Sequence, residues 1–188
     1  MRDSSRKAPS VTPAWVGLLA ALGLGLLLAA AVSAAPKSQF TLPALDGERF
    51  SLQEALEEGP VVLDFWATWC KPCIKSLPAL QKVAREFEER GVGVYAVNVD
   101  GPRNQPKVRP FLKRHRLELP VLLDHSREVM KQFQLAGMPA TIVFSTEGEV
   151  AYKHFGYKPG DEIRLREKLT ELLQGAEPDS TKGEADEG

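Results

Sequence analysis

The segment Val61–Cys73 reads VVLDFWATWCKPC, an apolar run followed closely by a Cys-x-x-Cys pair. The run Val61–Trp66 is apolar throughout except for Asp64, which is typical of a central β-strand covered on both faces. From Cys73 onward, apolar residues recur at helical spacing as far as Phe87 and predict an amphipathic helix. The two cysteines are therefore expected where a buried strand ends and a helix begins.

A cysteine pair at such a junction is suited to redox chemistry. The first turn of a helix offers unpaired backbone N–H groups and the positive end of the helix dipole, which favour the thiolate that attacks disulfides. We expect Cys70 to be exposed there and to act as the nucleophile, and Cys73 to lie beneath it and resolve the mixed disulfide. The chain has only these two cysteines, so they belong to no wider disulfide framework.

Two other uses of the cysteine pair remain open, an inert structural disulfide and half of a zinc site. A tetrahedral zinc ion needs about four ligands. The only histidines are His115, His125 and His154, which lack ligand spacing and are expected at the surface. We therefore expect neither a metal nor a cofactor.

Composition divides the 188-residue chain into four parts. A net charge of −1 with 26% charged residues gives no basic surplus, so no nucleic-acid partner is expected. The expected parts are a basic cytoplasmic N-terminus (1–13), a signal-anchor or transmembrane helix (14–35), one α/β domain (36–174) and a disordered acidic tail (175–188).

The N-terminal apolar segment sets the expected location. Its length is close to the roughly 20 residues that span a bilayer and exceeds the roughly 7–15 of a cleavable signal. The small residues Val32-Ser33-Ala34 keep cleavage open as the alternative to an anchor. Because Arg2, Arg6 and Lys7 precede the segment, the domain is expected in the periplasm or otherwise outside the cytoplasm. It would be held there by a single pass through the inner membrane, or secreted to the same compartment if the segment is cleaved.

Strands and helices are predicted to alternate between residues 40 and 173, which is typical of an α/β sandwich with a mixed sheet. A first hairpin is expected around Asp46-Gly47, and Ser51 with Glu54 matches a capping box. Asp161 is expected to cap the last helix. Further strands are predicted at 92–99, 120–123, 140–144 and 150–155, and further helices near 108–112, 127–133 and 161–173.

The segment Phe65–Cys73 is similar to the active-site segment of thioredoxin-fold oxidoreductases, and the chain most resembles their membrane-anchored TlpA/ResA-type branch. The resemblance covers about residues 40–173 and includes the insertion between Val99 and Pro120 and the tripeptide Gly137-Met138-Pro139. It implies a thioredoxin-like three-layer sandwich with a central mixed β-sheet, preceded by a membrane segment.

The resemblance implies roles for Asp64 and Pro139. Asp64 matches the buried acid that relays protons to and from the second cysteine, and a lone carboxylate in an apolar strand is expected to have a raised pKa or a partner. An aspartate bonded to backbone is the alternative. Pro139 matches a cis-proline beside the cysteines that exposes the backbone of Met138 to a peptide, whereas a trans proline at a strand edge is the alternative.

Residues beside Cys70 are expected to contact the substrate. Trp69 directly precedes it, Lys71 places a screened cation near the thiolate, and Pro72 suits the first turn of a helix. Trp66, at the end of the strand, is equally well explained as core. One position departs from the branch: a glutamate commonly lies three residues after the second cysteine, and here that residue is Ser76, which weakens a specific link to cytochrome c maturation.

The sequence thus predicts an extracytoplasmic thiol–disulfide oxidoreductase, a reductase rather than an oxidant, that acts on protein cysteine pairs. Cytochrome c maturation is one setting that the resemblance suggests, and a membrane protein as electron donor is another of its implications. Two other functions stay open, a peroxiredoxin-like peroxidase and a non-catalytic peptide-binding module. A peroxidase usually has Thr-x-x-Cys where residues 67–70 read Ala-Thr-Trp-Cys, and a pure binding module has no use for a reactive dithiol.

Overall fold

The computed structural model describes residues 38–175, so the expected membrane segment and the acidic tail lie outside the described residues. At its centre is a five-stranded sheet in the order β5-β4-β3-β6-β7. β3 pairs in parallel with β4, and β4 with β5, whereas β6 is antiparallel to both β3 and β7. The strands are β3 (Val61–Trp66), β4 (Gly93–Asn98), β5 (Val121–Leu123), β6 (Ala140–Phe144) and β7 (Val150–Phe155).

A small hairpin and several helices surround this sheet in the described part of the chain. The hairpin consists of β1 (Thr41–Pro43) and β2 (Arg49–Ser51). The helices are α2 (Leu52–Glu58), α3 (Lys71–Phe87), α4 (Val108–His115), α5 (Glu128–Gln132) and α6 (Asp161–Gly175), with 3₁₀ turns at Glu88–Arg90 and Gln105–Lys107. Among residues 38–175, none of the helices is both long and apolar enough to cross a membrane.

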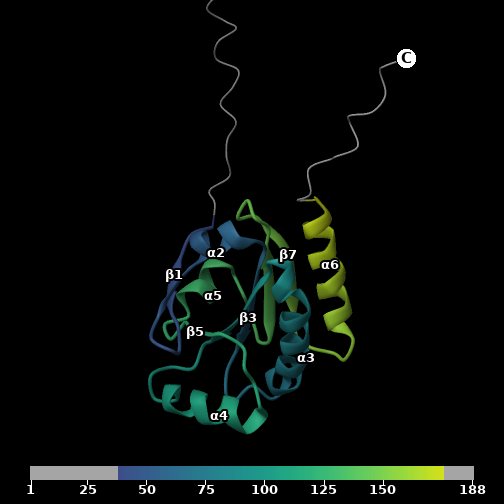
Figure 1. Cartoon of the computed structure of the whole chain (residues 1–188). Helices are drawn as coiled ribbons and strands as arrows, with labels where there is room; N and C mark the ends of the chain where they lie inside the picture. The colour runs from purple at the N-terminus through teal and green to yellow at the C-terminus, as the bar shows by residue number, and fades with distance from the viewer. Residues whose placement is uncertain (1–37, 176–188) are drawn as a thin grey trace, which may run out of the picture. The chain divides into compact units, whose positions relative to one another are not determined.

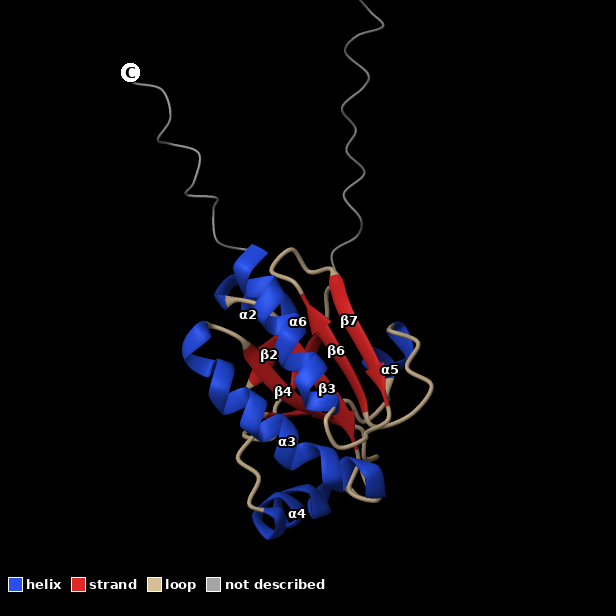
Figure 2. Ribbon diagram, turned by 90° about the vertical axis from the view of Figure 1, so that its right-hand side faces the viewer, coloured by secondary structure: helices blue, strands red, loops and turns tan. Residues whose placement is uncertain are grey.

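The elements form three layers, as Figures 1 and 2 show. α3 and α6 lie together on one face of the sheet, and α5 and the β1–β2 hairpin lie on the other. Contacts between aromatic rings hold that second layer. The ring centroids of Phe50, in the hairpin, and Tyr95, in β4, lie 4.6 Å apart. Those of Phe133, just after α5, and Phe144, in β6, lie 5.2 Å apart. The thioredoxin-like three-layer sandwich with a mixed sheet is thereby confirmed.

Two features of the sheet position the site. Successive side chains of a strand point to opposite faces, so Asp64 and Trp66 both point toward the layer that contains α3. Every residue of β3 is buried, as expected for a central strand.

The predicted capping box is also confirmed, because Ser51 Oγ accepts the backbone N–H of Glu54 at 3.4 Å. α4 lies across the end at which β3 finishes (Figure 1).

Candidate active site

The two cysteines lie where β3 gives way to α3, as the sequence predicted. Their sulfurs form a disulfide, with the Cα atoms 5.3 Å apart. Cys70 is the N-cap of α3, and its Sγ accepts the backbone N–H of Cys73 at 3.3 Å. Pro72 occupies the first turn, where a missing N–H costs nothing. A sulfur in this position receives a backbone donor and lies at the positive end of the helix dipole.

The exposure expected for Cys70 was wrong in this disulfide state. Cys70 is only 5% exposed and Cys73 is fully buried. The reason is local: the Cys70 side chain turns back over the first turn of the helix, where its sulfur is bonded to Cys73. The residues around it are exposed, with Trp69 at 55% and Lys71 and Pro72 also open to solvent. A molecule that approaches the site therefore meets these neighbours before it meets the sulfur.

Asp100 holds the loop that leads to the cysteines, and sequence reasoning missed it. Its carboxylate accepts the backbone N–H of Thr68 at 2.8 Å and the Thr68 hydroxyl at 3.1 Å. The Asn98 side chain donates to the same carboxylate at 2.9 Å. Asp100 is fully buried. The available signal was the pair of polar residues, Asn98 and Asp100, at the end of the apolar strand predicted at 92–99.

The predicted cis peptide bond before Pro139 is confirmed. Ala140 is paired with Phe65 across the β3–β6 ladder, so the residues before it lie at the end of β3 that leads to the cysteines. The Pro139 carbonyl accepts the backbone N–H of Gly156 at 2.8 Å, which ties this loop to the segment after β7. Met138 is half-buried. Its contact with a peptide stays a prediction.

A groove of about 660 Å³ lies beside Trp69. Arg127 lies over the Trp69 ring, with its guanidinium carbon 6.0 Å from the ring centroid. Trp66 is fully buried, and its ring centroid lies 5.0 Å from that of Phe111, so it is part of the core. The groove combines apolar and basic side chains and is lined by Thr68, Trp69, Asn104, Pro106, Lys107, Pro110, Phe111 and Arg114.

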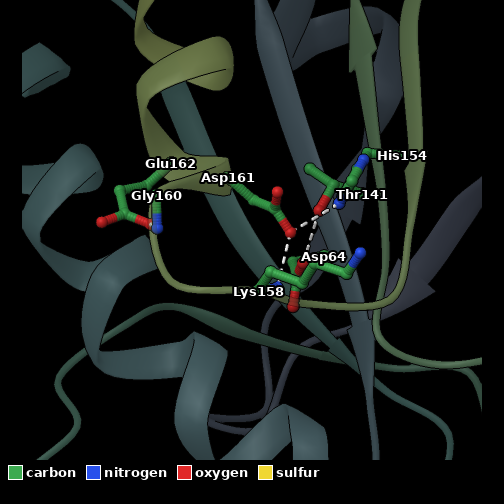
Figure 3. A network of polar contacts seen from close by, with 7 residues as sticks. All are labelled: Asp64, Thr141, His154, Lys158, Gly160, Asp161 and Glu162. Carbon is green, nitrogen blue, oxygen red and sulfur yellow. Dashed lines mark hydrogen bonds and ion pairs between the residues drawn. The ribbon is translucent and has the colours of Figure 1, made fainter.

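Asp64 is 3% exposed in the middle of the sheet. Its Oδ1 accepts the Thr141 hydroxyl at 2.7 Å, whereas its Oδ2 has no partner among the described residues (Figure 3). Burial disfavours the charged form and raises the pKa of Asp64 from 3.8 to about 7, against a smaller lowering by the Thr141 hydrogen bond. The expected raised pKa and partner are both confirmed, and the partner is a side chain rather than backbone.

Ser76, at the position of the branch's glutamate, is buried on α3. Its hydroxyl donates to the Cys73 carbonyl at 3.1 Å, and it lines a small cavity together with Asp64. Within residues 38–175, no three histidine, cysteine, aspartate or glutamate side chains lie close enough to hold a metal ion.

The three histidines, which were predicted to lie at the surface, are all partly buried. The side chain of His154 is 25% exposed. It lies on β7, packed beneath α6, and its Nε2 is 3.0 Å from Asp161 Oδ2. Asp161 does not act as the expected cap. It is the first residue of α6, and its carboxylate turns back to accept the backbone N–H of Lys158 at 2.6 Å.

Comparison with known proteins agrees with this geometry. The sequence profile of the family described as AhpC/TSA matches residues 33–153. The chain belongs to this family. It is 33% identical over 135 residues to a protein named thiol-disulfide oxidoreductase ResA from Halalkalibacterium halodurans, which covers 72% of this chain and 73% of the relative.

Two solved structures share the fold. A putative thiol:disulfide interchange protein DsbE from Chlorobium tepidum matches with a TM-score of 0.66 and 28% identity, over 73% of this chain and 94% of the other. StoA from Bacillus subtilis matches with a TM-score of 0.60 and 29% identity, over 71% of this chain and 98% of the other. Together with the Cys70–Cys73 pair at the start of α3, these likenesses identify the chain as a thioredoxin-fold thiol–disulfide oxidoreductase of the ResA/StoA type.

Proposed function

We propose that this oxidoreductase reduces disulfides in client proteins outside the cytoplasm. The observation that carries the proposal is Cys70 as the N-cap of α3, where the Cys73 N–H reaches its sulfur. In the reduced protein the same donor and the helix dipole favour a Cys70 thiolate. That thiolate attacks one sulfur of the client disulfide, and the other client sulfur leaves as a thiolate and takes a proton from solvent.

The second half of the cycle depends on Cys73. Its thiol loses a proton to the Asp64 carboxylate, and the resulting thiolate attacks Cys70 Sγ in the mixed disulfide. The Cys70–Cys73 bond forms, the bond to the client breaks, and the second client thiolate leaves. Two electrons have then passed from the protein to the client. We propose that a membrane protein restores the dithiol, since the cycle consumes reducing equivalents.

The client is proposed to lie across the exposed surface around the cysteines. Trp69, Lys71 and Pro72 surround Cys70 and are open to solvent. The backbone of Met138, before the cis-proline, is proposed to pair with an extended client segment, as the resemblance implies. Trp69 also borders the neighbouring groove, so a longer client can extend along it.

The location is part of the proposal. We infer that residues 14–35 anchor the chain in the inner membrane, or direct its secretion if they are cleaved. The catalytic domain then lies in the periplasm or its equivalent. Cytochrome c maturation is a proposed setting there. An alkaline phosphatase fused after Gly175 is therefore expected to be active, and a cytoplasm-dependent reporter at the same position inactive. The opposite pattern would contradict the inferred topology.

If the protein acts as a reductase, the Cys70–Cys73 couple is expected to have a low reduction potential. Cys70 has one backbone donor from Cys73 and one exposed cation at Lys71, which give moderate thiolate stabilisation. We expect a potential nearer to the roughly −270 mV of thioredoxin than to the roughly −120 mV of a strong oxidant. Equilibration with glutathione buffers, followed by tryptophan fluorescence, measures it. A value above about −170 mV would reject the reductase, because the difference is nearly 5 kcal/mol for two electrons.

Two other functions are less well supported. A peroxidase would need a peroxide-activating residue where Ala67 precedes Cys70 by three positions, and the Ala67 side chain carries no hydroxyl. A passive peptide-binding module gives no reason for a cysteine pair that caps a helix on the face of the sheet toward which a buried acid points. Insulin reduction and peroxide consumption separate the three functions.

A further inference from the structure

We propose that His154, held by Asp161, carries protons between Asp64 and solvent. This inference rests on the relay role proposed above for Asp64. It adds a route, since an acid that is 3% exposed cannot exchange its proton with bulk water directly. Burial raises the pKa of Asp64 to about 7, so near neutral pH part of the folded protein holds a proton on Asp64 that must leave before Cys73 can deliver its own.

A small cavity begins at Asp64. It has a volume of about 40 Å³, enough to hold water, which needs roughly 10–15 Å³. Asp64 lines it, and Asp64 Oδ2 has no partner in the described part of the protein. Ser76 and Thr141 add hydroxyl groups to the lining. Polar groups of this kind give a water molecule in the cavity hydrogen-bond partners next to the buried carboxyl group.

The sheet register leads from Asp64 to His154. Asp64 on β3 is paired with Thr141 on β6, and Thr141 is paired with His154 on β7. Paired residues point to the same face of a sheet, so the three side chains form a row beneath α6. Figure 3 shows this row, with Asp161 beside it at the start of the helix. His154 also lines the cavity.

The row ends at the surface beside the cysteines. A depression of about 680 Å³ on the outside is lined by His154 and Asp161, and also by Pro72, which lies between Cys70 and Cys73. His154 and Asp161 line the smaller cavity as well. The two residues therefore line both hollows, and their side chains are 25% and 21% exposed.

The side chains of His154 and Asp161 suit proton transfer. An imidazole can accept a proton on one nitrogen and release one from the other near neutral pH. The backbone N–H of Lys158 lowers the pKa of Asp161, whose Oδ2 lies 3.0 Å from His154 Nε2. The other titratable groups that line the two hollows with His154 and Asp161 are Tyr152 on β7, Tyr157 and Lys158 after it, Glu162 and Arg164 on α6, and Asp64 on β3.

The test isolates the step that releases the Cys73 proton. Reduced full-length protein is mixed with a stoichiometric aryl disulfide whose thiolate is coloured, so that a first release reports attack by Cys70 and a second reports attack by Cys73. His154→Gln is expected to leave the first release unchanged and to slow the second about tenfold near neutral pH, less than the usual effect of a general base because cavity water still exchanges. Added imidazole is expected to restore the rate.

The controls separate this inference from the relay itself. His115→Gln, on α4, is expected to behave as wild type, and Asp64→Asn to slow the second release more than His154→Gln does. If Asp64→Asn slows it and His154→Gln does not, the proposed route is wrong and the relay stands. If neither slows it, the relay is wrong. A slow His154→Gln variant that imidazole fails to restore would show a structural effect and would also overturn the route.

Discussion

Changing Cys73 to serine is expected to leave client proteins covalently trapped on Cys70. The variant keeps the helix N-terminus that favours the Cys70 thiolate, so the first attack still proceeds. It lacks the sulfur that would displace the client, because Cys73 is the only other cysteine. Turnover should fall by more than about a thousandfold, since the loss of a nucleophile commonly costs at least that much.

Changing Cys70 to serine is the matched comparison. Cys73 is fully buried beneath the helix start, so without Cys70 we expect neither turnover nor trapping. Trapping is measured by purifying each tagged variant after alkylation and separating the complexes on gels with and without reductant. Equal trapping by the two variants, or more by Cys70→Ser, would show that the two roles are reversed.

Changing Asp64 to asparagine is expected to stabilise the protein above neutral pH while slowing its catalysis. Burial raises the pKa of Asp64 from 3.8 to about 7. Between these two values the unfolded chain has lost a proton that the folded chain keeps, so the stability of the wild type falls by about 1.4 kcal/mol per pH unit. Above about pH 7 the folded protein contains a buried charge that costs roughly 4 kcal/mol in total.

Asparagine does not titrate, so the stability difference between variant and wild type should depend on pH. We expect it to be smallest below about pH 4 and to grow by roughly 4 kcal/mol toward pH 8. Urea unfolding at several pH values measures it, and Glu57→Gln, on the exposed face of α2, serves as the control with no such trend. A difference that stays constant across this range would mean that Asp64 is not a buried acid with a raised pKa.

The sequence predicted the elements whose pattern is local. The apolar run of β3, the amphipathic α3 and the helix start between them follow from residue spacing, and they place Cys70 and Cys73 correctly. The cis bond before Pro139 came from the family resemblance, because the preference of an isolated X–Pro bond for trans is too weak to reveal it.

The parts that the sequence could not predict depend on contacts between distant segments. Asp100 reaches Thr68 across 32 positions, and His154 becomes a neighbour of Thr141 only through the register of β6 and β7. The burial of Cys70 depends on a side-chain direction at the helix cap, which spacing does not specify. The first two contacts need the paired sheet before they can be inferred.

The most direct measurement is the stoichiometric reduction of insulin. The full-length protein is reduced, freed of reductant and mixed with oxidised insulin, and thiols are counted on both proteins while peroxide consumption is followed in a parallel sample. We predict that one insulin disulfide is reduced for each Cys70–Cys73 pair that is oxidised. The Cys70→Ser variant is expected to leave insulin unreduced. Peroxide is expected to be consumed far more slowly than insulin is reduced. Insulin left intact by the reduced protein, or peroxide consumed faster than insulin, would contradict a disulfide reductase.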